Sequence, residues 1–318
     1  MIRFEWPGSR QQLALLAVVA LVVTAGCAGL GSPDGTGDDT AQDNDPEDPG
    51  SETEQNDDDS TDEGGDESGE NSTESTENAV FSDLEPVEQN VTAAGLLNDS
   101  VKALDTVESY RIEQNITTVQ RSNNQEVTTR NNQTGRIDRA QQRAAIEGVT
   151  DSQTGLINTQ QYLLNDSLYE SNERIAQQYG TQWVRTNLTG SFGQVFQQFD
   201  SVAQLELLFA NATGTVEGRT EIDGEDVYAV SATVDSEALV ESRQSVTGVD
   251  RYQLNLWLST ETALPAQVAE DSVLTVSTVR GTFTQQTDSL LRFTYEAVEI
   301  TLPEAADGAP TAEEVTGQ

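Results

Sequence analysis

A segment of 48 residues without a single basic side chain does most to limit what this chain can fold into. Between residues 31 and 78 lie 19 aspartates and glutamates and no lysine or arginine, set among Gly, Ser, Thr, Pro and Asn. This composition offers too little apolar surface to offset the conformational entropy lost on ordering. We therefore expect a disordered acidic linker, roughly 40 Å from end to end as a root-mean-square average, and a folded body only after it.

The carboxylates of this linker could also bind calcium. However, no stretch of it has the D-x-[DN]-x-[DN]-G loop with a distal glutamate that is typical of an EF-hand. The sequence therefore favours a tether over a metal site.

The residues before the linker have the pattern of a secretory signal peptide. Arg3 and Arg10 supply positive charge, an apolar run extends from Leu13 to Val23, and the tripeptide AGC follows at 25–27. An apolar run of this length makes a helix of roughly 17 Å, which is too short for a hydrocarbon core of about 30 Å. We expect a signal peptide over residues 1–26.

Cys27 is the only cysteine of the chain. With the Ala-Gly before it, it resembles the lipobox of bacterial and archaeal lipoproteins. The resemblance implies cleavage before Cys27 and a lipid on its sulfur; a plain signal peptide with a chance cysteine is the alternative. As a lipoprotein, the mature chain would begin with lipidated Cys27 and the linker, residues 27–78. It would face the outside of the cell membrane and have no thiol left for a disulfide.

The remaining residues, about 240, are enough for one substantial core. They include 35 acidic and 14 basic residues, and Lys102 is the only lysine of the chain beside fifteen arginines. Acidity with almost no lysine resembles the proteins of salt-accumulating halophiles, since molar salt shortens the Debye length to about 3 Å. Because no basic stripe is present to meet phosphates, nucleic acid is not an expected partner.

Acceptor sequences for N-glycosylation are frequent, which indicates a surface exposed to an external glycosylation system. The content of Asn, Ser and Thr would give about three Asn-X-Ser/Thr sites by chance, and the chain has eight. The candidate asparagines are Asn71, Asn90, Asn98, Asn115, Asn132, Asn165, Asn187 and Asn211.

Apolar periodicity predicts a helix over residues 91–108 and then short strands rich in Thr, Val, Ile and Tyr. The strand signals are SYRIEQNITTV, GRIDRAQQRAAIEGV, QQYLLND, SLYESN and TQWVRT. A second helix is predicted from Phe192 to Phe209, where apolar residues recur every three or four positions. Ser191 would cap its start and Asn211 its end.

More strands are predicted after this helix. A hairpin turns at Asp223-Gly224, a short helix covers residues 236–243, two strands lie between 252 and 279, and SLLRFTYEAVEITLP closes the chain. Successive strands joined by short turns predict an α+β fold, with an antiparallel β-sheet and few helices. Residues 304–318 are expected to form a disordered C-terminal tail.

Four segments together resemble the LolA-like superfamily, which includes LppX-like lipoproteins and related archaeal lipoproteins. They are VESYRIEQ, VEGRTEIDGEDVYAV, LWLSTETALPAQV and FTYEAVEITLP, and the resemblance spans roughly residues 91–303. It implies a LolA-like domain over 79–303, in which a curved, incompletely closed antiparallel sheet, a half-barrel, wraps a few helices. It also implies an apolar concavity that carries lipid or acyl chains.

Few residues are available for catalysis. The chain has no histidine, which removes Ser-His and Cys-His chemistry and the commonest metal ligand, and it has no G-x-S-x-G or phosphate-loop motif. We therefore expect a protein that is not an enzyme and that uses no cofactor or metal.

Two functions remain open. The first is a carrier whose cavity is lined by aromatic and aliphatic side chains, with Phe192, Phe196, Phe199, Tyr252, Leu256, Phe293 and Tyr295 as candidates. The same residue types fill closed cores, so the sequence does not distinguish a cavity from a core. The second is a surface module without a ligand cavity, which binds or senses another envelope protein through a sheet edge or a glycan-decorated face.

Overall fold

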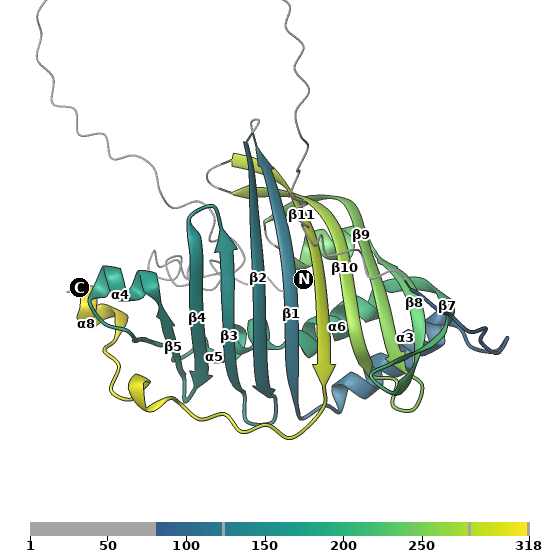
Figure 1. Cartoon of the computed structure of the whole chain (residues 1–318), viewed down its shortest axis with the longest axis horizontal. Helices are drawn as coiled ribbons and strands as arrows, with labels where there is room; N and C mark the ends of the chain where they lie inside the picture. The colour runs from purple at the N-terminus through teal and green to yellow at the C-terminus, as the bar shows by residue number, and fades with distance from the viewer. Residues whose placement is uncertain (1–80, 123–124, 244, 279–280, 317–318) are drawn as a thin grey trace, which may run out of the picture. The chain divides into compact units, whose positions relative to one another are not determined.

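The computed structural model describes residues 81–122, 125–243, 245–278 and 281–316 (Figure 1). The predicted signal peptide, Cys27, the acidic linker and Asn71 lie outside the described residues. Within the described part of the chain, no helix is both long and apolar enough to cross a membrane.

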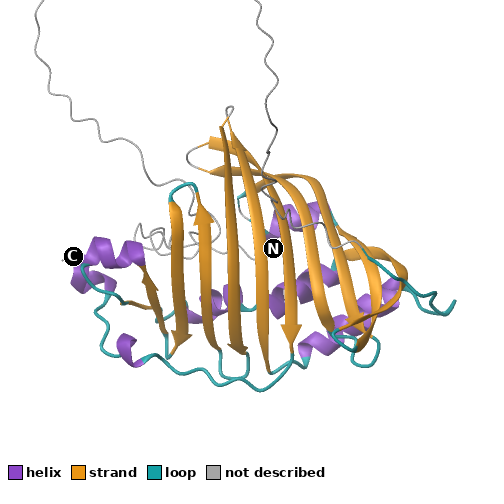
Figure 2. Cartoon of the chain, in the orientation of Figure 1, coloured by secondary structure: helices purple, strands orange, loops and turns teal. Residues whose placement is uncertain are grey.

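Eleven strands form one sheet in which every neighbouring pair is antiparallel (Figure 2). They are β1 (Ser109–Ser122), β2 (Gln125–Asp138), β3 (Arg143–Ser152), β4 (Gly155–Leu164), β5 (Ser167–Asn172), β6 (Val184–Asn187), β7 (Ala212–Ile222), β8 (Glu225–Val234), β9 (Val246–Ser259), β10 (Pro265–Thr278) and β11 (Gly281–Thr294). Their order is β6-β5-β4-β3-β2-β1-β11-β10-β9-β8-β7, so the sheet is open and ends at β6 and β7. The predicted α+β class with an incompletely closed antiparallel sheet is confirmed.

The order of the strands explains where the main helices lie. Strands β1 to β6 step outward to one edge, whereas β7 to β11 begin at the other edge and return to pair with β1. The connection from β6 to β7 must therefore cross the whole sheet, and it contains α5 (Phe192–Phe199) and α6 (Ser201–Ala210). Figure 1 shows both helices behind one face of the sheet, which we call the concave face.

The remaining helices are α3 (Ala93–Asp105), α4 (Glu173–Tyr179), α7 (Ser236–Ser242), the 3-10 helix η1 (Glu304–Ala306) and α8 (Ala312–Thr316). The predicted first helix corresponds to α3, whose N-cap Thr92 accepts a hydrogen bond from the Gly95 amide at 3.2 Å. Leu97 and Leu104 of α3 are buried in the main core with Val202 and Phe209 of α6. These apolar contacts cover the concave face near β7.

Segments from the two ends of the described chain bond to the two edge strands. Glu85 and Arg219 of β7 exchange backbone hydrogen bonds of 2.7 and 2.9 Å. Leu84 packs so closely on the same strand that a Cβ at Gly218 would lie 2.7 Å from the Leu84 Cβ. At the other edge, the Arg185 amide of β6 donates to the Pro310 carbonyl at 2.9 Å. Backbone groups that could pair with another strand are therefore already used at these points.

The single helix predicted from Phe192 to Phe209 is wrong, because the structure has two helices there. Asp200, with φ −85° and ψ 87°, separates α5 from α6. Its carboxylate accepts a hydrogen bond from the Ala203 amide at 3.3 Å and so caps α6. The sequence signal was the aspartate inside the apolar pattern, since aspartate is a preferred N-cap residue. Ser191 also does not cap α5, because its hydroxyl donates to the Leu188 carbonyl.

Two other expectations differ from the structure. The segment GRIDRAQQRAAIEGV contains the end of β2, a turn at 139–142 and the start of β3, not one strand. The predicted disordered tail at 304–318 contains η1 and α8, and Ala306 is completely buried in a small second core with Trp183 and Ile300. Burial of these apolar side chains stabilises an ordered path for the tail.

Candidate functional site

The helices do not fill the concave face completely. A central cavity of about 380 Å³ lies between the middle of the sheet and the region where α5 meets α6. A lateral cavity of about 270 Å³ lies toward α4 and β6. Asn131, Gln133, Ile146 and Gln161 line both cavities, so the two hollows adjoin along one face of the sheet.

The strands give the central cavity a mixed lining. Ile112, Gln114, Ile116 and Thr118 alternate along β1 and all face the cavity, because side chains two residues apart lie on the same side of a strand. On the neighbouring β2, Thr129, Asn131, Gln133 and Gly135 do the same. The Gln133 amide nitrogen donates to Gln114 Oε1. The sheet wall therefore offers both apolar surface and hydrogen-bonding groups.

The other wall comes from the helices and from strands on the far side of β1. On the side of the helices, the cavity is lined by Phe199 of α5 and by Leu205 and Leu208 of α6. Apolar side chains of β9, β10 and β11 complete the wall, namely Leu254, Val268 and Leu291. An apolar chain that lay in the cavity would contact these side chains, and no helix or strand would have to move to admit it.

Of the seven lining residues predicted from the sequence, Phe199 lines the central cavity. Phe196, Tyr252, Leu256 and Phe293 are buried in the main core, and Phe192 and Tyr295 pack against it. The lining residues that sequence reasoning missed include all those on β1 and β2. Their signal is weak because polar and apolar types alternate without a clear period on the inward side.

A buried polar cluster fixes the wall made by α6. Arg139 Nε lies 2.8 Å from Asp200 Oδ2, and its Nη2 lies 2.8 Å from Glu206 Oε1. The Tyr110 hydroxyl donates to Asp200 Oδ1 at 3.1 Å and accepts from the Val202 amide at 3.2 Å. Burial and the nearby Asp200 charge raise the pKa of Tyr110. Burial alone would lower the pKa of Arg139, but the carboxylates of Asp200 and Glu206 raise it.

A second polar group lies on the wall formed by β9, β10 and the end of α7. Arg243 Nη2 donates to the Tyr252 hydroxyl at 3.1 Å, and its guanidinium lies 5.4 Å from the centre of the Tyr252 ring. Glu270 accepts a hydrogen bond from Ser272 Oγ at 2.9 Å. Burial, followed by the charge of Glu270, raises the pKa of Tyr252. Arg243 and Glu270 both line the central cavity.

The lateral cavity contains one carboxylate in a sheltered position. Glu170 of β5 accepts a hydrogen bond from the side-chain Nε2 of Gln161 at 2.8 Å. Burial raises the pKa of Glu170. Arg174 of α4 lines the same cavity, and its Nη2 donates to Thr154 Oγ1 at 3.4 Å. The lining of the lateral cavity therefore contains an acidic and a basic side chain, as that of the central cavity does.

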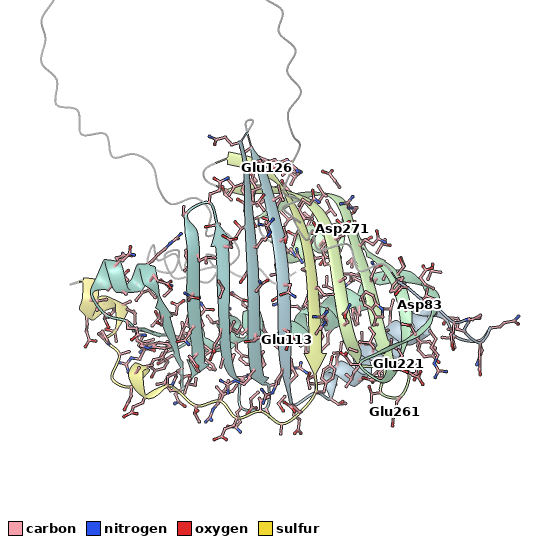
Figure 3. All side chains as sticks on the ribbon, viewed as in Figure 1. Asp83, Glu113, Glu126, Glu221, Glu261 and Asp271 are labelled. Carbon is pink, nitrogen blue, oxygen red and sulfur yellow. The ribbon has the colours of Figure 1, made fainter. Side chains whose placement is uncertain are left out.

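The opposite, convex face of the sheet carries both acidic and basic side chains, such as Asp271 and its ion-pair partner Arg251. Figure 3 places Glu113 and Asp271 on this face, toward the viewer. Six of the seven described sequon asparagines are exposed, and Asn115 is half-buried opposite Asn132 on neighbouring strands. Among the described residues, no group of three or more His, Cys, Asp or Glu side chains could hold a metal ion.

The fold and site define a class: an open antiparallel sheet whose crossover helices cover one face and leave a hollow between. No family model and no curated relative matches the sequence. Among solved structures, the chain is similar to the lipoprotein LppX of Mycobacterium tuberculosis, with a TM-score of 0.39, 10% identity, and 66% of this chain and 98% of LppX covered.

Two further solved structures are similar to the chain. LprF of Mycobacterium bovis has a TM-score of 0.41 and 16% identity, with 67% of this chain and 97% of LprF covered. A LolA superfamily protein of Nitrosomonas europaea has a TM-score of 0.22 and 12% identity, with 67% of this chain and 96% of that protein covered.

Proposed function

We propose that the chain is a membrane-anchored, extracytoplasmic lipoprotein that binds or carries an apolar ligand, a lipid or acyl chain, in the hollow of its sheet. The observation that supports this most directly is the central cavity, because its volume of about 380 Å³ falls within the range of about 300–1,000 Å³ for small-molecule sites. Apolar side chains of two helices and several strands lie in its mixed lining, so a bound chain would have apolar contacts on both sides.

The inward side of β2 argues against a core that is simply closed. Thr129, Asn131 and Gln133 point toward the helices from the middle of the sheet. Polar side chains packed against an apolar core without partners would cost free energy. In a hollow, they instead meet solvent or a ligand, which explains why the sequence can tolerate them there.

The alternative, a surface module that acts through a sheet edge, has less support. The β7 edge is bridged by Glu85 and the β6 edge by the segment at Pro310 and Thr311. A partner strand would have to displace these segments before it could pair at the same positions. The convex face, which carries the glycosylation candidates Asn115 and Asn132, remains the surface on which such a partner would bind.

Two features of the sequence support the proposed location at the outside of the membrane. The AGC tripeptide supports lipid attachment at Cys27, and the acidic linker would then separate the lipid from the folded body. The exposed sequon asparagines of the body support contact with an external glycosylation system. No catalytic step enters the proposal, since ligand binding needs only the cavity.

The experiment is mass spectrometry of the full chain, purified from its native membrane under conditions that keep it folded. We expect an apolar small molecule to be released in near-stoichiometric amount on denaturation. A folded protein that releases nothing and takes up no added lipid would reject the carrier function and leave the interaction module.

A further inference from the structure

The guanidinium of Arg243 lies at the wall of the central cavity and forms no ion pair within the described part of the chain. Burial alone would lower the pKa of Arg243, but Tyr252 and the charge of Glu270 raise it. Arg243 follows α7 directly, and its amide donates to the Leu239 carbonyl at 3.2 Å, which fixes the backbone beside the cavity. Five described arginines form ion pairs with carboxylates, and of the described arginines without such a pair, Arg243 lines the central cavity. Among the described residues, no carboxylate lies within 4.0 Å of the Arg243 guanidinium.

The hydrogen bonds of Arg243 are also incompletely used. A guanidinium has five N–H donors, and its side chain makes one hydrogen bond to the described residues, to the Tyr252 hydroxyl at 3.1 Å. The guanidinium lies over the ring of Tyr252, which adds a cation–π contact to the hydrogen bond. Glu270 compensates part of the desolvation of this cation without direct contact, and the remaining N–H donors of the guanidinium are available to an anion in the cavity.

The wall around Arg243 limits the charge of that anion. Glu270 lines the same cavity and lies near enough to affect Tyr252. Its carboxylate accepts a hydrogen bond from Ser272 Oγ at 2.9 Å. A group with a single negative charge can pair with Arg243 beside Glu270, whereas a second negative charge would be repelled by it.

The apolar side of the cavity is directly available to the rest of such a ligand. Leu254 and Val268 line the cavity beside Arg243 and Glu270, and Phe199 lines it from the helices. The volume of about 380 Å³ is near the lower end of the range for small-molecule sites, which fits one chain better than two. The polar group and the chain of one molecule could therefore both be satisfied.

We propose that the ligand of the central cavity is an acidic amphiphile with one apolar chain and one singly charged oxygen group, and that Arg243 binds this group. The inference rests on the proposed function, because it presupposes an apolar ligand in the cavity. Arg243 then determines specificity: it distinguishes an acid from a neutral molecule with the same chain.

The test compares dodecanoate with 1-dodecanol, each below the concentration at which it aggregates, as competitors of the neutral dye Nile red bound to the full chain. We expect dodecanoate to compete about tenfold to a hundredfold better than the alcohol, since hydrogen bonds to charged groups contribute this much. In R243Q the two affinities should converge. The matched control is R251Q on β9, because Arg251 pairs with Asp271 on the convex face, and this variant should keep the preference.

Thermal unfolding of each variant establishes that it is folded, and R243K gives a second variant that retains the charge. Competition by both molecules with no preference in the wild type, or a preference that survives in R243Q, would overturn the role of Arg243 and leave the carrier function intact. If neither molecule competes and Nile red does not bind, the proposed function itself fails.

Discussion

Arg139 Nε and Asp200 Oδ2 lie 2.8 Å apart, and their pairing joins the turn between β2 and β3 to the break between α5 and α6. The side chain of Asp200 is 5% exposed and that of Arg139 is 18% exposed, so the ion pair is largely removed from water. Arg139 Nη1 also donates to the carbonyls of Leu104 and Val107 at the end of α3, at 2.7 and 3.1 Å. One side chain therefore holds three elements around the cavity.

Replacing Asp200 by Ala should destabilise the fold strongly. The change removes one partner of a buried ion pair, the cap of α6 and an acceptor for Tyr110, so we expect a loss of about 3–5 kcal/mol in the free energy of unfolding. Urea denaturation measures it. The control is E126A, which breaks the exposed pair of Glu126 with Arg121 at 2.7 Å and should cost at most about 1 kcal/mol. Equal losses in the two variants would contradict the structural role of Asp200.

Phe196 and Phe199 lie on the same helix and should respond differently to replacement by Ala. Phe196 is buried in the main core, so its loss should cost about 3–5 kcal/mol. Phe199 lines the central cavity, so its replacement enlarges a space that already exists and should cost less, while retained ligand decreases. Chemical denaturation and mass spectrometry of bound lipid test this. A full core cost at Phe199 with no change in bound ligand would count against the cavity.

Glu170 should make stability depend on pH in a direction set by its raised pKa. The folded state favours the neutral acid of Glu170. The free energy of unfolding therefore decreases as the pH rises through the folded-state pKa and Glu170 ionises. E170Q keeps an oxygen acceptor for Gln161 and carries no charge. We expect its thermal midpoint to exceed that of the wild type near pH 7 and to match it below pH about 4.

Glu173 provides a control of the opposite sign. Hydrogen bonds from the Asn158 side chain and amide lower its pKa, so its stabilisation is present above its ordinary pKa and is lost as the pH falls. E173Q should therefore be less stable than the wild type near pH 7, and the difference should shrink in acid. If E170Q and E173Q shift the midpoint in the same direction at neutral pH, the assignment for Glu170 is wrong.

Stability should rise with salt over the whole multimolar range. Residues 79–318 contain 35 carboxylates against 14 cations, and screening reduces their mutual repulsion. We expect the thermal midpoint to increase steeply between about 0.1 M and several molar KCl. A midpoint that does not change with salt would remove the argument for a halophile-type surface.

Cys27 should be the attachment point of a lipid. Peptide mass spectrometry of the mature protein should show Cys27 as the N-terminal residue with a lipid on it. C27S should be found either in the soluble fraction or as an uncleaved precursor, because the attachment chemistry requires the sulfur. Wild-type protein with a different, unmodified N-terminus would contradict this prediction.

The sequence by itself determined the elements that depend on local pattern. The hairpin at Asp223-Gly224 was predicted correctly because both residues adopt positive φ, 53° and 87°, which few other residue pairs do readily. The helix at α3 was also predicted, since its buried residues recur at helical spacing. Short turns between strands were sufficient to indicate an antiparallel sheet.

Only the tertiary structure decided which side chains of the sheet and the helices face a cavity and which are packed in the core. The inward side of β2 is polar because it faces a cavity and not a packed core, so this strand had no apolar alternation to predict it. The break at Asp200 depends on Arg139 and Tyr110, which are 61 and 90 residues away in the chain. Phe196 and Phe199 have the same residue type and similar burial, and the position of the helix alone decides that Phe199 meets the cavity. Local sequence sets periodicity, whereas a cavity arises from packing between elements that are distant in the chain.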